Sequence, residues 1–286
     1  MKRSILFMLL VVFAGCIASY SQQSEAPKRQ GWREDDIFGD VESVTITDFK
    51  LIDKFGEMVK DERVSKVVYK FNSKGDVVEK IGYNSDDSLD WKELYKYDVQ
   101  GVLIEVTVYN SNGSLSTKTL FKYDSQGNKI EETRYKSDGL LDLKEISKYD
   151  SRGNQIECAH YNSDGSLSTK ALFKYDSRGK NIEAMVTMYF SGFSFSMKTT
   201  RIYDSQCKLI EESDFNSDGS QSAKTLFKYN SLGNKIEKSS YKGDGSLDYK
   251  YLYKYDSRDN RIEYIRYNGE IMIPVYMEDR KIVYRK

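Results

Sequence analysis

The chain has 286 residues, with 44 basic and 44 acidic side chains, 23 Tyr, 13 Phe and only 2 Pro. Abundant tyrosine and 31% charged residues, with almost no helical periodicity, favour half-exposed strands over a deep aliphatic core. If Lys2 and Arg3 leave with a leader, 42 basic residues face 44 acidic ones, and a net charge of minus two excludes the basic surface that nucleic-acid-binding proteins use.

The first 21 residues have the form of an export signal: Lys2 and Arg3, the apolar run 5–14, and then small residues. The apolar run is too short to span a bilayer. Two processing routes remain open. The sequence Phe13-Ala14-Gly15-Cys16 resembles the lipobox of bacterial lipoproteins, in which the cysteine is lipidated and becomes the first mature residue. The alternative is ordinary cleavage near residues 19–21.

Residues 22–40 are polar and have no period, so we expect a flexible tether. A β-hairpin repeat domain is predicted over 41–286, with an atypical cap at each end. In the first cap, residues 41–69 keep strand character but contain a long turn at 53–61. In the last cap, residues 271–284 contain Pro274, which suits an edge strand.

The repeat is visible in an aromatic residue that ends a strand and is followed by Asp or Asn. This residue recurs at Phe71, Tyr97, Tyr123, Tyr149, Tyr175, Tyr203, Tyr229 and Tyr255. The spacing is 26 residues throughout, except for 28 between Tyr175 and Tyr203. A period held this strictly predicts about eight tandem units that each contact only their neighbours.

Each unit contains two turn signals, such as those at 124–127 and 162–165, most of them with Asp or Asn first and Gly fourth. This chemistry predicts a type I turn with a G1 bulge, which connects hairpin strands. The segments between turns, such as 129–135 and 143–149, are predicted strands. We expect Tyr123 to pair with Lys129 and Lys122 with Ile130, which places an aromatic row on one face.

These elements predict an all-β fold in which the hairpins form one long antiparallel meander sheet. Open twisted sheets rarely exceed ~10 strands without curling. We therefore expect the sheet to curl, with its aromatic face turned at least partly inward. Whether it closes is left open by the sequence.

The motif Lys-Tyr-Asp-Ser-x-Gly-Asn at 122–128, with near copies from Lys148 and Lys174, resembles the YD repeat of RHS-type proteins. The resemblance covers residues 67–267. It implies a cell-surface or secreted hairpin array of a sugar-binding or wall-associated kind. The chain departs from that family in its longer 26-residue unit and in lacking a C-terminal toxin module. With Cys16, it also resembles a small Gram-negative envelope lipoprotein.

The hairpin at 185–197 breaks the repeat, because it adds two residues and carries aromatic side chains at its tip. The candidate binding residues are Tyr189, Phe190, Phe193 and Phe195. Exposed aromatic side chains are costly in water, so they predict a contact with a partner or a glycan. The alternative is a degenerate unit whose aromatic side chains fold back onto the sheet.

Cys158 and His160 lie two apart on one predicted strand and therefore on one face, as a thiol and base would. Equivalent positions of the preceding unit hold Glu132 and Arg134, so we interpret the pair as variation rather than catalysis. Cys207 is too distant for a disulfide with Cys158. With one His in the chain, we expect no metal site, no cofactor and no catalytic residue. The turns also lack the oxygen-ligand pattern of calcium loops.

Two functional hypotheses follow. In the first, a non-enzymatic envelope or secreted protein binds a polymer such as a glycan or cell-wall component through its aromatic repeat surface, because repetition suits many weak contacts. In the second, the chain is a structural spacer or a scaffold for an envelope protein, which docks at 185–197 or at a terminal strand. In both, any membrane attachment is through a lipid on Cys16.

Overall fold

The computed structural model describes residue 37 and residues 39–285. The predicted export signal at 1–21, lipidation at Cys16 and nearly all of the predicted tether lie outside the described residues. Of the segment 22–40, Ile37 is buried against Val41, Val44 and Phe71.

The described chain forms an antiparallel meander of hairpins. Its 18 strands are β1 (Val41–Lys54), β2 (Glu57–Phe71), β3 (Val77–Tyr83), β4 (Leu89–Tyr97), β5 (Leu103–Asn110), β6 (Leu115–Tyr123), β7 (Lys129–Lys136), β8 (Leu141–Tyr149), β9 (Gln155–Asn162), β10 (Leu167–Tyr175), β11 (Asn181–Phe190), β12 (Phe193–Tyr203), β13 (Leu209–Phe215), β14 (Gln221–Tyr229), β15 (Lys235–Lys242), β16 (Leu247–Tyr255), β17 (Arg261–Asn268) and β18 (Pro274–Tyr284). The prediction of an all-β hairpin fold is confirmed.

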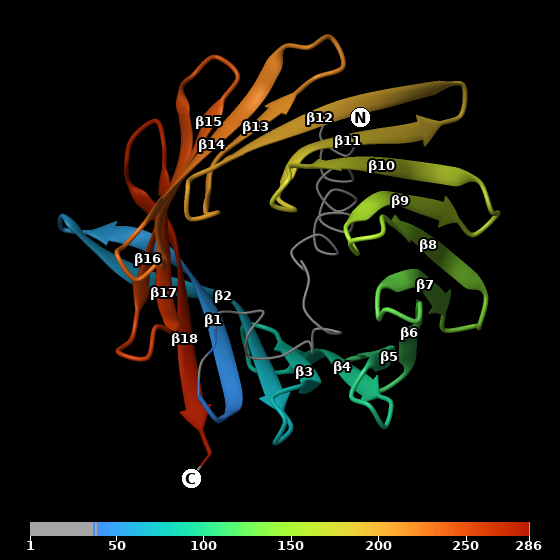
Figure 1. Cartoon of the computed structure of the whole chain (residues 1–286). Coiled ribbons are helices and arrows are strands. Elements are labelled where there is room, and N and C mark those ends of the chain that lie inside the picture. Colours follow the sequence, from blue (N-terminus) through green and yellow to red (C-terminus); the bar gives the residue numbers. More distant parts are fainter. Residues whose placement is uncertain (1–36, 38, 286) are drawn as a thin grey trace.

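The sheet closes into a barrel, which corrects the expectation of an open, curled sheet. β1 pairs with β2 on one side and with β18 on the other, from Val41 opposite Tyr284 to Lys50 opposite Tyr276. Figure 1 shows the ring, with β1 (blue) and β18 (red) side by side. Closure removes the two edges that a sheet of this size would otherwise expose.

Both end segments therefore differ from the predicted caps. The first hairpin has no long turn, since Lys54 pairs with Glu57 and only Phe55 and Gly56 connect the strands. Pro274 is the first residue of β18, which is an internal strand rather than an edge. Proline is tolerated there because the first residue of a strand need not donate to the ladder.

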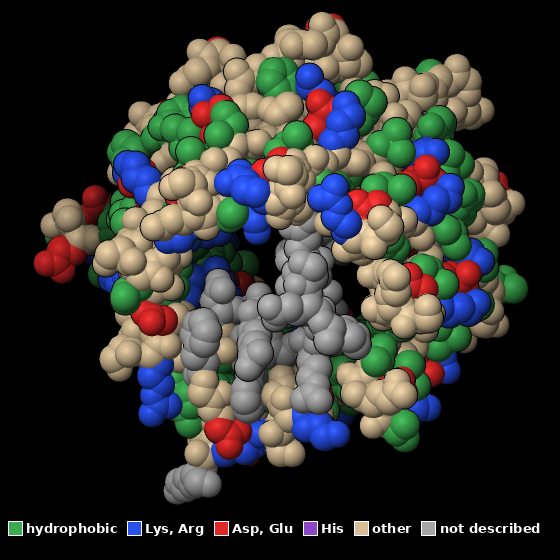
Figure 2. Space-filling view, in the orientation of Figure 1, with side chains coloured by type: hydrophobic (Ala, Val, Ile, Leu, Met, Phe, Trp, Pro, Cys, Tyr) green, Lys and Arg blue, Asp and Glu red, His purple; other side chains and the backbone are tan. Residues whose placement is uncertain are grey.

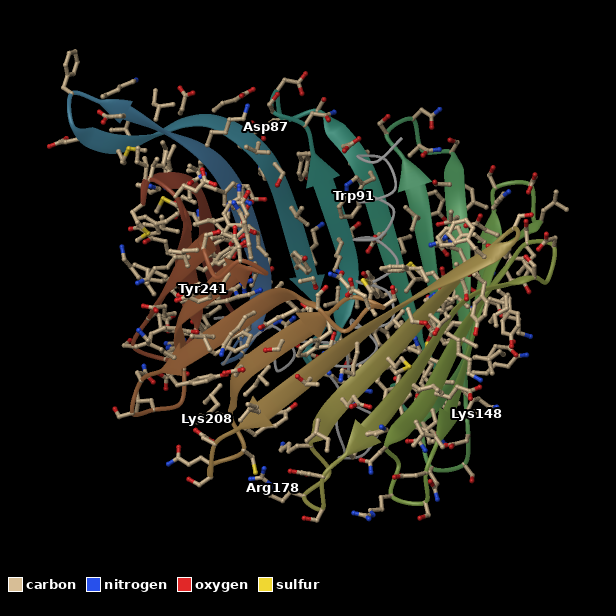
Figure 3. All side chains as sticks on the ribbon, turned by 90° about the horizontal axis from the view of Figure 1, so that it is seen from above. Asp87, Trp91, Lys148, Arg178, Lys208 and Tyr241 are labelled. Carbon is tan, nitrogen blue, oxygen red and sulfur yellow. The ribbon has the colours of Figure 1, made fainter. Side chains whose placement is uncertain are left out.

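The two kinds of turn lie at opposite ends of the barrel. In Figure 3, Arg178 and Lys208, from turns that follow a Tyr-Asp signal, lie at the end opposite Asp87. Gly127 and Gly165 have φ angles of 84° and 81°, which is the conformation predicted for the fourth turn position. Cys207 takes the same conformation, at 62°, without being glycine.

The predicted strand register is wrong by one residue beyond the first pair. Tyr123 pairs with Lys129 as expected, but a β-bulge follows, so that Lys122 pairs with Glu131 rather than Ile130. A one-residue shift exchanges the faces of all later side chains. Glu131 therefore shares a face with Lys122, and the positions of Cys158 and His160 lie on the opposite face.

The burial of side chains identifies the inner face of the barrel. Cys158 and Ala171, which pair across β9 and β10, are both fully buried. On the other face, the side chains of Lys148 and Lys174 are 63% and 72% exposed. Side chains crowd together on the concave face of a closed sheet, so the face of Cys158 is the inner one.

Candidate functional site

The outer face repeats the same ion pairs from unit to unit. At one position every unit carries glutamate: Glu79, Glu105, Glu131, Glu157, Glu183, Glu211, Glu237 and Glu263. Each pairs with one or two lysines of neighbouring strands. Lys122 and Lys144 lower the pKa of Glu131 to about 2. Figure 2 shows such basic and acidic side chains scattered among apolar ones.

The inner face differs from unit to unit. At the position that Cys158 occupies, successive units carry Lys80, Val106, Glu132, Cys158, Ala184, Glu212, Lys238 and Tyr264. A repeated outer face suffices to hold neighbouring units in register. A particular ligand requires side chains found in one place only, so a binding site is expected on the inner face.

The tyrosines of the Tyr-Asp signal connect units rather than form an open binding surface. Six of them donate a hydrogen bond of 2.7–2.8 Å to a backbone carbonyl 20 residues earlier: Tyr97, Tyr123, Tyr149, Tyr175, Tyr229 and Tyr255. Tyr123, for example, donates from the end of β6 to the carbonyl of Leu103 at the start of β5. Burial raises the pKa of Tyr123 to about 12.

A second group of tyrosines gathers on the inner face of β16, β17 and β18. This tyrosine patch consists of Tyr249, Tyr251, Tyr253, Tyr264 and Tyr276, all half-buried. Tyr264 lies at its centre, with ring centroids 5.9–6.0 Å from those of Tyr251, Tyr253 and Tyr276. The register places these side chains on one face, because Tyr253 is opposite Tyr264.

Basic side chains cover several rings of the tyrosine patch. The guanidinium of Arg266 lies 4.8 Å from the ring centroid of Tyr249 and 5.5 Å from that of Tyr276. Lys238 lies 5.5 Å from the ring of Tyr251. The patch thus combines flat apolar rings with hydroxyl and guanidinium donors, which is a surface suited to an amphipathic ligand.

The irregular hairpin is the longest of those between β2 and β18, and its aromatic tip is exposed. Phe190 and Phe193 pair across a two-residue turn, with their rings stacked at 4.8 Å. Tyr189, Phe190 and Phe193 are 39%, 45% and 64% exposed, whereas Phe195 is half-buried opposite Met188. In Figure 1 the hairpin of β11 and β12 extends away from the centre of the ring. Three of the four candidate binding residues are therefore accessible.

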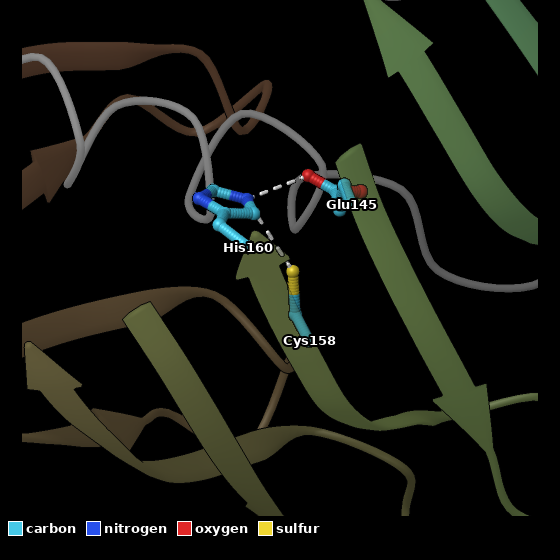
Figure 4. Close-up of side chains that lie close together, drawn as sticks. All are labelled: Glu145, Cys158 and His160. Carbon is cyan, nitrogen blue, oxygen red and sulfur yellow. Dashed lines mark hydrogen bonds and ion pairs between the residues drawn. The ribbon is translucent and has the colours of Figure 1, made fainter. Parts of the chain in front are cut away.

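The inner face of β8 and β9 holds a buried cluster of Glu145, Cys158 and His160 (Figure 4). His160 Nε2 lies 2.9 Å from Glu145 Oε2 and 3.8 Å from Cys158 Sγ. The ligand atoms of all three lie within 4.8 Å of one another. On β10, Ala171 is opposite Cys158 and Thr169 is opposite His160. Both side chains are small and buried, so there is room beside them for the larger side chains of the cluster.

Charges around this cluster compensate one another. Lys129 Nζ lies 3.1 Å from Glu145 Oε1 and 2.6 Å from Glu132 Oε2. Burial by itself would raise the pKa of Glu145, but His160 and Lys129 lower it to about 2. Burial would likewise lower the pKa of His160, but Cys158 and Glu145 raise it to about 9. A buried ion pair is stable only with such partners.

Sequence reasoning found two members of this cluster and missed the third. The spacing of Cys158 and His160 correctly placed both on one face. Glu145 lies on the preceding strand and is brought to His160 by their pairing across β8 and β9. The register that would have revealed it depends on a second β-bulge, between Lys148 and Tyr149, which lies beyond the predicted G1 bulge and which the turn sequence did not predict.

Within the described residues, no helix is long and apolar enough to cross a membrane. No family model and no curated protein matches the chain, so the YD-repeat resemblance stays a prediction.

The chain is similar to several solved structures at low TM-scores. A porin-like protein from Bacteroides uniformis is 10% identical, over 85% of this chain and 96% of that one, with a TM-score of 0.44. A LolA superfamily protein from Nitrosomonas europaea is 11% identical, over 89% and 90%, with a TM-score of 0.30. The Tc holotoxin pore of Photorhabdus luminescens is 14% identical, over 72% of this chain and 13% of that one, with a TM-score of 0.33. At these TM-scores, the likeness identifies neither a family nor a function.

Proposed function

We propose that the chain is an exported, non-enzymatic protein of the cell envelope that binds a glycan or another cell-wall polymer. The observation that carries this proposal is the tyrosine patch on the inner face of β16–β18. This differs from the expectation that the repeated aromatic rows bind the polymer, because those tyrosines are occupied in joining units.

The chemistry of the patch fits a sugar. A pyranose ring has apolar C–H faces and a rim of hydroxyls. Tyrosine rings offer flat apolar surface at low entropic cost, and their hydroxyls offer polar contacts. Arg266, held over two of the rings, adds planar donors for sugar oxygens. Five neighbouring tyrosines provide contacts for more than one sugar unit.

A second candidate function is a protein-interaction scaffold, favoured by the stacked and exposed pair of Phe190 and Phe193. An aromatic hairpin tip that extends from a rigid barrel is suited to anchor in a pocket of another protein. In this second function the barrel holds the hairpin in place for its partner, and the tyrosines of the patch only stabilise the barrel by packing against one another.

One experiment separates the two. The exported chain is incubated with a panel of glycans and insoluble cell-wall polymers, beside a Tyr251→Ala, Tyr264→Ala variant and a Tyr189→Ala, Phe190→Ala, Phe193→Ala variant. We expect binding that falls at least tenfold in the patch variant and is retained in the tip variant. Loss only in the tip variant moves the glycan site to that hairpin.

No binding to any polymer by the unmodified chain contradicts the glycan proposal and favours the scaffold. Circular dichroism of each variant checks that the fold is retained. A Tyr241→Ala variant is a matched control, because Tyr241 lies on β15 outside the patch.

A further inference from the structure

We propose that Glu145, Cys158 and His160 form a binding site for a thiophilic divalent metal ion, with Zn²⁺ as the ion that the donor set fits best. One carboxylate, one thiol and one imidazole converge on the inner face of β8 and β9. Sulfur, nitrogen and oxygen donors of these kinds are the protein ligands of zinc.

Two of the three ligand separations are close to those around a tetrahedral ion, and all three ligand atoms lie within 4.8 Å of one another. With a Zn–S bond of about 2.3 Å and a Zn–N bond of about 2.0 Å, sulfur and nitrogen ligands lie roughly 3.5 Å apart. Cys158 Sγ and His160 Nε2 are 3.8 Å apart. His160 Nε2 and Glu145 Oε2, at 2.9 Å, need to separate by only a few tenths of an ångström. Three protein ligands leave a fourth position for water, as in an open zinc site.

The imidazole is oriented for this role. Its Nε2 faces both the thiol of Cys158 and the carboxylate of Glu145, yet one ring nitrogen carries a single hydrogen at most. An ion in the place of that hydrogen contacts both partners at once. Lys129 engages Oε1 of Glu145, so Oε2 is the oxygen directed toward the site. Such supporting contacts orient metal ligands in known sites.

The charges also balance. Lys129 and Glu132 compensate each other nearby. The carboxylate of Glu145 and a thiolate on Cys158 would supply two negative charges, which match the charge of a divalent ion. A buried site that kept a net charge would be costly.

The cluster occurs once in the array. The equivalent positions in the neighbouring units hold Glu132 and Arg134 before it and Ala184 and Val186 after it. Polar residues are expected by chance at exposed positions of a repeat, where substitutions have little cost. Glu145, Cys158 and His160 are not at such positions, because each is at most 6% exposed. Burying a carboxylate and an imidazole in the middle of a strand pair lowers stability unless their partners compensate.

The test uses the chain from residue 22 onward, in which Cys16 is absent, after dialysis against a chelator. Zn²⁺ is titrated in competition with a chromogenic chelator. We expect one equivalent per chain, with affinity weakened at least tenfold by Cys158→Ser and by His160→Gln. Cys207→Ser is the matched control, because Cys207 lies in a turn at the rim and outside the cluster.

Co²⁺ supplies a readout that is independent of the variants' stability. In the Cys207→Ser chain, Co²⁺ bound by Cys158 gives a thiolate-to-metal charge-transfer band. No uptake of Zn²⁺, or uptake without that band, overturns the proposal, as does unchanged affinity in folded Cys158→Ser. The Tyr251→Ala, Tyr264→Ala variant should bind Zn²⁺ normally, so the metal and glycan proposals stand or fall separately.

Discussion

At the scale of single residues, tyrosine has two separate roles in this barrel. Six tyrosines of the Tyr-Asp signal donate a hydrogen bond to the preceding strand, and this shared contact accounts for their recurrence. In the patch, Tyr264 occupies a position that other units fill with different residue types, and the rings of the patch contact one another and Arg266. The sequence alone shows both as aromatic residues in strands, and only their hydrogen bonds and ring contacts distinguish them.

Replacing Tyr123 with Phe should destabilise the barrel by about 1–2 kcal/mol, because the half-buried carbonyl of Leu103 loses its donor. Urea unfolding followed by circular dichroism measures this. Tyr241→Phe should change stability by less than about 0.5 kcal/mol, since Tyr241 donates no such hydrogen bond to any residue that the structure describes. Equal effects of the two substitutions would show that the hydroxyl of Tyr123 does not join the units.

At the scale of elements, the hairpin is the unit that the sequence encodes well. The turn signals correctly located almost every hairpin, because Asp or Asn with a later Gly determines the turn through local contacts. Asp124 illustrates this, since its carboxylate accepts hydrogen bonds from the backbone of Gln126 and Asn128. The G1 bulge of these turns was predicted, but the second β-bulge one pair beyond the turn was missed, and with it the correct face of Glu145.

A phenylalanine at the tip of the irregular hairpin and one in the buried core of β10 should differ in their effect on stability. Phe193 is 64% exposed at its tip, so Phe193→Ala should change stability by less than about 0.5 kcal/mol. Phe173 on β10 is buried among Ala184 and Val186, so Phe173→Ala should cost about 3–5 kcal/mol. Thermal unfolding of both variants measures the difference. A large loss with Phe193→Ala would mean that the tip packs onto the sheet.

At the scale of the whole molecule, closure decides which surfaces exist. Pairing of β1 with β18 joins strands that lie more than 200 residues apart, and Arg285 binds Asp40 through both backbone and side chain at the same seam. Closure divides the sheet into a repeated outer face and a varied inner face. Both proposed sites, the tyrosine patch and the metal cluster, lie on the inner one.

Closure is testable by a disulfide across the seam. Thr45 is directly opposite Lys281, so Thr45→Cys with Lys281→Cys should form a disulfide under mild oxidation, detected by peptide mapping. The control pairs Thr45→Cys with Lys174→Cys, an exposed position on β10. A disulfide in neither protein would contradict the closed barrel, because an open sheet keeps β1 and β18 apart.

The sequence by itself determined the strands, the turns and the 26-residue repeat, because hydrogen bonds between near neighbours specify them. It also placed Cys158 and His160 on one face, since strands alternate with a fixed period of two. Tertiary structure alone decided the closure, the inner face and the presence of Glu145 beside His160. These features depend on pairing between strands. One bulged residue exchanges the faces of the side chains that follow it, and β1 and β18 meet only because all the hairpins between them curve in the same direction.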